Sequence, residues 1–162
     1  MPAATVTPGR IALLCLSGLV TLWLLGFFQT GTMDSIPSHF TIEIDGKPIA
    51  KVDGGAEDHT EAKLGEEPAI FSLKDSRLQC GDRIMGRNLA ENRSFGPKPV
   101  SWYKANAENE KRVQAVTAKK EGDAYQLLFA NAPLMVTDEG MVMADLMARS
   151  KSEVKVILQE EN

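Results

Sequence analysis

Hydrophobic residues follow two patterns along this chain, one unbroken apolar run near its start and short alternating runs beyond it. The unbroken run extends from Ile11 to Phe28 without a charged residue. An apolar helix of about 20 residues is long enough to cross a hydrocarbon core of ~30 Å. The sequence therefore predicts a transmembrane signal-anchor over residues 11–28, preceded by a short tail over residues 1–10.

Charges beside the predicted span indicate its orientation. Arg10 precedes the span, whereas Asp34 and Glu43 come before the first basic residue that follows it. Basic residues next to a span are retained on the cytoplasmic side. We therefore expect a single-pass membrane protein with a cytoplasmic tail. The polar residues 29–38 would form a tether, and residues 39–162 an extracytoplasmic domain in a secretory lumen, at the cell surface or in the periplasm.

A cleaved signal is the alternative interpretation of the same apolar run. Small-residue sites of the A-x-A kind mark signal cleavage, and the residues from Gln29 to Thr32 resemble such a site only weakly. If cleavage occurs near Thr32, the domain is secreted.

The first alternating run predicts a half-buried strand. Phe40, Ile42 and Ile44 alternate with polar residues, and the Asp45-Gly46 pair that follows is a strong signal for a two-residue hairpin turn. With that turn, Ile42 faces Ile49 on the returning strand.

A second hairpin is predicted around residues 75–76. Phe71 and Leu73 share one face of a strand, and a two-residue turn at Asp75-Ser76 places Leu78 opposite Leu73 and Cys80 opposite Phe71. Both cross-strand pairs are apolar, as expected on the face that covers a core.

Further strands are predicted over residues 100–104, 113–118, 125–130, 141–146 and 153–158, and loops over 53–67 and 86–99. One short helix is expected between 143 and 150. Short strands at this spacing predict an all-β domain, an antiparallel β-sandwich or small β-barrel, with a β-trefoil as the alternative.

Composition restricts the classes of partner. The formal net charge of -4 argues against nucleic acid binding. Cys80 is the single cysteine beyond the apolar run, so the domain cannot form an internal disulfide. It is expected to be a small buried residue or, less favoured, a thiol that pairs between chains.

Catalytic and metal-binding motifs are scarce in the sequence. The histidines are His39 and His59, and no G-x-S-x-G, H-E-x-x-H or glycine-rich phosphate motif occurs. The acidic loop around His59 has no spacing typical of a cation site. We expect no cofactor, no metal and no catalysis, and an enzyme with an unassigned carboxylate pair is the least favoured alternative.

A basic loop within this acidic chain is the candidate binding element, because functional residues concentrate on loops held by a rigid scaffold. Arginine and tryptophan are also common at interface hot spots. The candidate residues are Arg83, Arg87, Asn88, Arg93, Lys98 and Trp102. If the three arginines lie at the surface, replacing them together by alanine leaves thermal stability nearly unchanged.

The same loop carries an N-glycosylation sequon at Asn92, followed by Arg93 and Ser94. A sequon is used only when the loop enters a secretory lumen, which the predicted orientation permits.

These features favour a non-catalytic, membrane-anchored domain that binds another protein, as an accessory subunit of a membrane complex. The alternative is a secreted or tethered module that binds a carbohydrate or small ligand, or an inhibitor. That alternative requires an exposed aromatic platform, for which the candidates are Trp102, Tyr103 and Tyr125.

Overall fold

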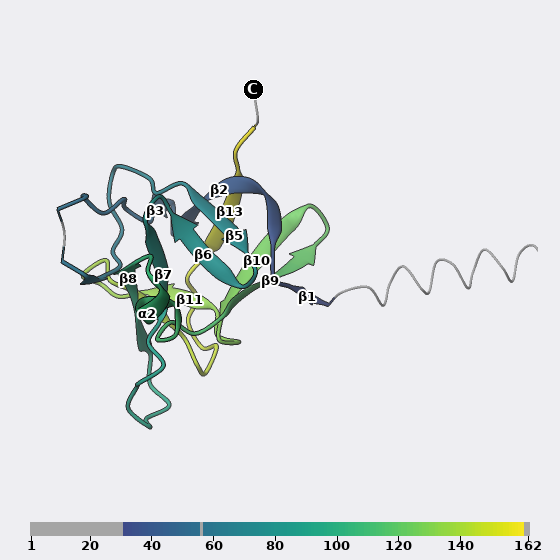
Figure 1. The fold of residues 1–162 in the computed structure, drawn as a ribbon. Coiled ribbons are helices and arrows are strands. Elements are labelled where there is room, and N and C mark those ends of the chain that lie inside the picture. Colours follow the sequence, from purple (N-terminus) through teal and green to yellow (C-terminus); the bar gives the residue numbers. More distant parts are fainter. Residues whose placement is uncertain (1–30, 56, 161–162) are drawn as a thin grey trace, which may run out of the picture. The chain divides into compact units, whose positions relative to one another are not determined.

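A computed structural model describes residues 31–55 and 57–160 (Figure 1). The predicted signal-anchor at 11–28 and the tail at 1–10 lie outside these residues. Within the described part, no helix has the length and apolar character needed to cross a membrane.

Short antiparallel strands make up most of the domain, which confirms the predicted all-β class. The strands are β1 (Thr32–Met33), β2 (Ile36–Ile44), β3 (Lys47–Pro48), β4 (His59–Glu61), β5 (Phe71–Lys74), β6 (Arg77–Cys80), β7 (Arg83–Arg87), β8 (Lys98–Lys104), β9 (Val116–Glu121), β10 (Ala124–Phe129), β11 (Leu134–Val136), β12 (Val142–Ala144) and β13 (Val154–Leu158). A short helix, α2 (Ala107–Glu110), follows β8.

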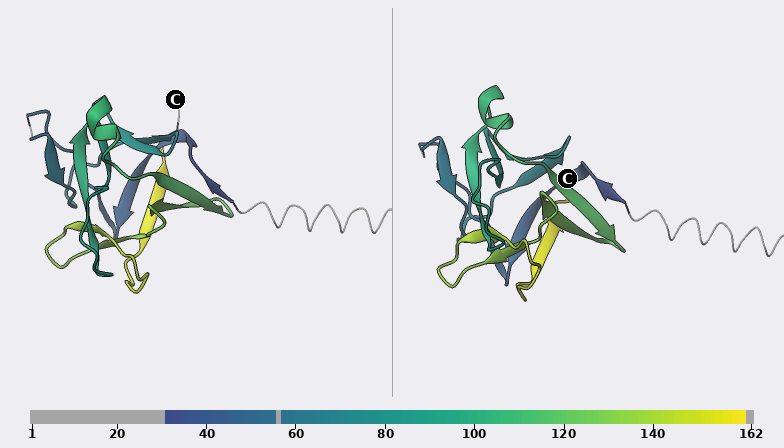
Figure 2. Two further views of the ribbon diagram at one scale, coloured as in Figure 1. Left: turned by 60° about the horizontal axis from the view of Figure 1, so that its bottom comes forward. Right: turned by 90° about the horizontal axis from the view of Figure 1, so that it is seen from below.

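The strands form two sheets that curve into half a barrel. The larger sheet has the order β11-β12-β8-β7-β6-β5-β2-β13, with β3 paired to β2 and β4 paired to β8. The smaller sheet has the order β1-β9-β10. Figure 2 shows β13, in yellow, beside β2, in dark blue. Strand β10 lies next to β13, so the small sheet approaches the last strand of the large one.

Both predicted hairpins are confirmed. Ile44 pairs with Lys47 across a two-residue turn, and the backbone N–H of Ile49 donates to the carbonyl of Ile42 at 2.8 Å. Leu73 pairs with Leu78 across the second turn. All four turn residues have positive φ, as a type I′ turn requires: Asp45 (52°), Gly46 (85°), Asp75 (51°) and Ser76 (62°).

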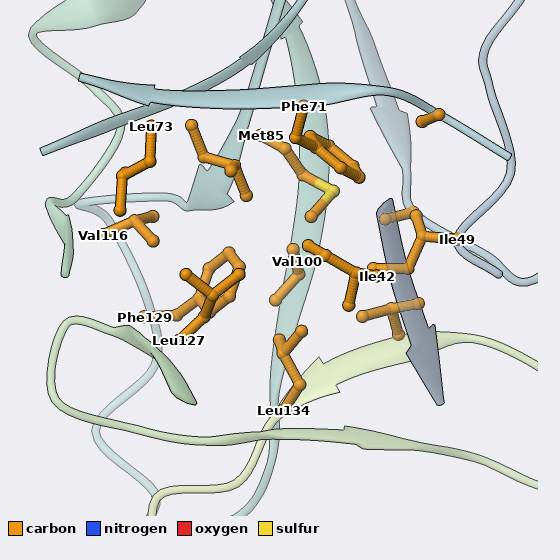
Figure 3. Packing of buried hydrophobic residues seen from close by; sticks show 14 of the residues in the cluster. Ile42, Ile49, Phe71, Leu73, Met85, Val100, Val116, Leu127, Phe129 and Leu134 are labelled. Carbon is orange, nitrogen blue, oxygen red and sulfur yellow. The ribbon is translucent and has the colours of Figure 1, made fainter. Parts of the chain in front are cut away.

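The core lies between the large sheet and the β9–β10 hairpin (Figure 3). Alternation along β2 directs Phe40, Ile42 and Ile44 inward, and each is fully buried. The ring of Phe71 stacks on Phe40 with centroids 6.1 Å apart and on Trp102 with centroids 5.5 Å apart. This row of aromatic rings connects β2, β5 and β8.

The predicted helix between residues 143 and 150 is wrong. Val142–Ala144 is strand β12, and the chain then turns, with the carboxylate of Asp145 accepting the N–H of Ser150 at 2.7 Å. The helix occurs instead at α2, where the Asn106 side chain accepts the N–H of Asn109 and caps the first turn.

The predicted tether and loops contain strands that the pattern did not reveal. Residues 32–33 and 36–38 lie in β1 and β2, although the sequence places them in the tether at 29–38. The predicted loop 53–67 includes β4, and the predicted loop 86–99 includes the end of β7 and the start of β8. The strand predicted at 113–118 begins only at Val116 and continues to Glu121.

Candidate functional site

The 88–97 loop connects β7 to β8 and extends below the sheet in Figure 1. Three of the basic side chains assigned to it by sequence are buried, with exposures of 3% for Arg83, 7% for Arg87 and 2% for Lys98. All three belong to strands β7 and β8. The condition that the three arginines lie at the surface is therefore not met by Arg83 and Arg87.

Arg87 links the loop to the turn after β10. Its guanidinium forms an ion pair with Glu91, and it also donates to the backbone carbonyls of Phe129 at 3.0 Å and Ala130 at 3.2 Å. The planar guanidinium directs several N–H donors in fixed directions, so it can bond a carboxylate and two carbonyls at the same time. Arg83 likewise donates to the carbonyl of Glu57 at 2.8 Å. Both side chains thus serve as internal braces.

Lys98 fixes the other end of the loop. Its Nζ donates to the backbone carbonyl of Asn92 at 3.0 Å, to the hydroxyl of Ser94 at 3.1 Å and to the Asn92 side-chain oxygen. Asn92 is exposed, which leaves its side chain accessible. Glycosylation at this sequon stays a prediction.

Two candidates remain, Asn88 and Arg93, and only Asn88 has a side chain held by a hydrogen bond within the described residues. The side-chain oxygen of Asn88 accepts the N–H of Ala90 at 2.9 Å, which holds the start of the loop. Arg93 is exposed, and no side-chain hydrogen bond or ion pair of Arg93 is found among the described residues.

Trp102 belongs to the core and does not form a binding platform. It is 1% exposed, and its ring lies 8° from parallel to that of Phe71. On β8 it points to the face opposite Tyr103, because successive strand residues alternate. The exposed aromatic platform required by the carbohydrate-binding alternative is therefore not provided by Trp102.

An apolar groove lies between the tip of the loop and the turn after β12. Phe95 is 77% exposed on one side and Met147 is 45% exposed on the other. The groove has a volume of about 560 Å³ and is lined by Phe95, Gly96, Pro97, Met135, Asp145, Met147, Arg149 and Ser150. The sequence analysis missed Phe95, although a lone aromatic residue next to Gly96 and Pro97 is a signal of an exposed turn.

A second, more polar pocket lies on the inner side of the loop, where it meets β4 and β8. Its volume is about 260 Å³, and its lining consists of His59, Glu61, Asn88, Ala90, Glu91, Asn92, Lys98, Pro99, Ser101 and Tyr103. This pocket brings together Asn88, Asn92 and Lys98 of the sequence-predicted loop residues. It also adds β4, whose pairing with β8 could not be read from the sequence.

Tyr103 forms the buried wall of this pocket. Burial raises the pKa of its phenol above the ordinary value of 10.0, while the nearby side chains of Asn88 and Ser101 partly lower it. Its hydroxyl nevertheless makes no hydrogen bond of normal geometry within the described part of the chain. The exposed ring of His59 packs on the phenol ring at a centroid distance of 4.9 Å.

No family model, curated protein or solved structure matches this chain. Its function therefore has to be inferred from the two surfaces of the loop.

Glu61 and Glu91 both line the polar pocket, but Glu91 is held by Arg87 at 2.7 Å and is not a free base. Over the described ranges, no three His, Cys, Asp or Glu side chains are grouped closely enough to share a metal ion. Cys80 is a half-buried free thiol, and burial raises its pKa, which keeps it in the less reactive protonated form.

Proposed function

We propose that this chain is a membrane-anchored, non-catalytic β-domain of the small-barrel kind that binds another protein, as an accessory subunit of a membrane complex. The observation that carries the proposal is the position of Phe95, 77% exposed across an apolar groove from Met147. Aromatic residues and methionine are enriched at protein interfaces relative to the rest of the surface. In this proposal the 88–97 loop has the binding role predicted from the sequence, but Phe95 contacts the partner instead of the buried basic residues.

The loop that carries Phe95 is held by hydrogen bonds on both sides of its tip. Arg87 holds Glu91 on one side of the tip, and Lys98 holds Asn92 and Ser94 on the other. A loop whose backbone is already held in place loses less conformational entropy on binding, which favours affinity. The buried basic residues thus support recognition by shaping the loop rather than by contacting the partner.

The groove also has the composition expected of an interface core with a polar rim. Met135 and Pro97 contribute apolar surface beside Phe95, whereas Asp145, Arg149 and Ser150 supply charged and polar groups. Methionine adapts its shape to a partner because its side chain is unbranched and flexible.

Site-specific crosslinking tests this proposal in the full chain within its native membrane. A photoreactive phenylalanine analogue at Phe95 is expected to crosslink to one distinct protein. The same analogue at Ile70, which is 50% exposed just before β5, serves as the control and is expected to give no such product. Identical products from both positions, or no product from Phe95, would refute the proposal.

A matched pair of variants adds an independent measurement. Phe95→Ser together with Met147→Ser is expected to abolish co-purification of the crosslinked protein, whereas Ile70→Ser is expected to preserve it. Because the three side chains are exposed, the substitutions leave the core intact, and circular dichroism should show unchanged folding.

The membrane assignment has its own test. We propose that residues 11–28 anchor the domain, with the tail at 1–10 in the cytoplasm and Asn92 in a secretory lumen. The intact mass of the chain that resists alkaline carbonate extraction should include residues 11–28 and should fall on enzymatic deglycosylation. A mature chain beginning near Thr32 would instead identify a secreted domain, and the ligand or inhibitor alternative would replace the subunit proposal.

A further inference from the structure

The polar pocket beside the 88–97 loop contains a buried cation with no anionic partner. Lys98 is 2% exposed, and the three acceptors of its ammonium are neutral oxygens of Asn92 and Ser94. No carboxylate forms an ion pair with Lys98 among residues 31–55 and 57–160. A buried charge is costly unless an opposite charge compensates it. Glu91 lines the same pocket but is already paired with Arg87, so the Lys98 ammonium still favours an added anion.

The same pocket is rich in hydrogen-bond donors. Asn88 and Asn92 each use the side-chain oxygen within the loop, and the side chain of Asn88 also lies near the Tyr103 hydroxyl. Tyr103, which is 4% exposed, has a hydroxyl that makes no hydrogen bond of normal geometry in the described part of the chain, although the side chains of Asn88 and Ser101 lie near it. An unpaired buried hydroxyl is unfavourable, and a bound molecule that reaches it would remove that penalty.

The remaining walls define the kind of molecule that fits. The exposed ring of His59 lies against Tyr103 and gives the pocket an aromatic side, on which the CH face of a sugar ring can pack. Glu61 is exposed on the adjacent strand β4 and can accept hydrogen bonds from ligand hydroxyls. A volume of about 260 Å³ lies below the usual range for drug-sized ligands of ~300–1,000 Å³.

We propose that this pocket binds a small carboxylic acid that carries several hydroxyl groups, of the size of one sugar acid. The carboxylate lies beside the Lys98 ammonium and compensates its charge, while the three hydrogen bonds of Lys98 to Asn92 and Ser94 remain in place. The hydroxyls lie between Tyr103, Asn88 and Glu61. This site is separate from the Phe95 groove, and the proposal does not rest on the protein-binding function.

A purely structural role for Lys98 is the competing explanation, because its three hydrogen bonds also close the loop. That explanation predicts no ligand and no effect of Tyr103 on binding. The two explanations therefore differ in a direct binding measurement.

Calorimetric titration of the intact chain in detergent micelles tests the proposal with three probes. Glucuronate is expected to bind saturably. Glucose, which has the same hydroxyl-bearing ring without the carboxylate, is expected to bind at least ~10-fold more weakly, as is acetate, which has the carboxylate without hydroxyls. No saturable binding of glucuronate, or equal binding of glucose or acetate, overturns the proposal.

Variants assign the binding to this pocket. Lys98→Met should abolish glucuronate binding. Tyr103→Phe should weaken it about 3- to 10-fold without unfolding the chain, because the hydroxyl makes no hydrogen bond of normal geometry with the described residues. Lys104→Met, at the exposed end of the same strand, is the control and should bind as the unmodified chain does. If Lys98→Met fails to fold, Tyr103→Phe decides, and unchanged binding by that variant overturns the proposal.

Discussion

Arg87 donates two parallel hydrogen bonds to the carboxylate of Glu91, from Nη2 to Oε1 at 2.7 Å and from Nε to Oε2 at 3.2 Å. Both side chains are largely removed from water, with side-chain exposures of 8% and 13%. The pair closes the first half of the 88–97 loop, while the other guanidinium nitrogen reaches the carbonyls of Phe129 and Ala130. One side chain thus joins β7, the candidate binding loop and the end of β10.

Replacing Arg87 by alanine is expected to lower the free energy of unfolding by about 3 kcal/mol, because Glu91 and two carbonyls lose their donor while buried. Urea denaturation measures the change. Arg93→Ala, on the exposed part of the same loop, is the control and should change stability by less than ~0.5 kcal/mol. Equal effects of the two variants would contradict the role of Arg87 in holding the loop.

The triple replacement of Arg83, Arg87 and Arg93, expected from sequence to be neutral, should accordingly be strongly destabilising.

Trp102→Ala is expected to destabilise the domain by about 3–5 kcal/mol, because it removes the largest side chain of the core and leaves a cavity beside Phe71. Trp102→Phe should destabilise the domain clearly less, since a smaller ring can keep the stacking and the indole N–H has no hydrogen-bond partner among the described residues. Thermal unfolding followed by circular dichroism compares the two variants. Similar losses for both would mean that stacking on Phe71 contributes little.

Gly86→Ala should reduce stability by roughly 1–3 kcal/mol, because an added Cβ would lie 2.6 Å from Cγ1 of Val113 and the strand would have to shift. Gly96→Ala provides the comparison, because its Cβ would meet the Ser94 hydroxyl at an ordinary 3.6 Å. Chemical denaturation of the two variants measures the difference. A stable Gly86→Ala variant would show that Val113 moves aside without penalty.

The domain is expected to lose stability as the pH rises above about 10, in part because of Tyr103. Burial raises the pKa of this phenol in the folded chain, so the unfolded chain releases its proton first. The stabilising contribution is complete below the unfolded pKa and disappears as the pH rises through the folded one. Urea denaturation at pH 8 and pH ~10.5 should therefore show a smaller loss for Tyr103→Phe than for the unmodified chain. The same pH dependence in both proteins would exclude Tyr103 as the cause.

Local sequence signals were sufficient for the all-β class and both hairpins. Asp45-Gly46 and Asp75-Ser76 tolerate positive φ, and the apolar residues beside them alternate with a period of two. Because these constraints act within a few residues, they can be read without knowledge of the remaining chain. The strand at Arg83–Arg87 was missed, since buried charges at both its ends hide the apolar pattern of a strand.

Only the tertiary structure decided which residues of the candidate loop are available for binding. Arg87 and Lys98 have the composition of a basic surface, yet each is buried by segments distant in the sequence or by the folded loop itself. Strand β4 pairs with β8 across about 40 residues, and this pairing makes Tyr103 a pocket wall beside His59. The sequence by itself determined how the strands alternate and turn, because backbone geometry is local. It could not determine which charges lose contact with water, because burial depends on long-range packing.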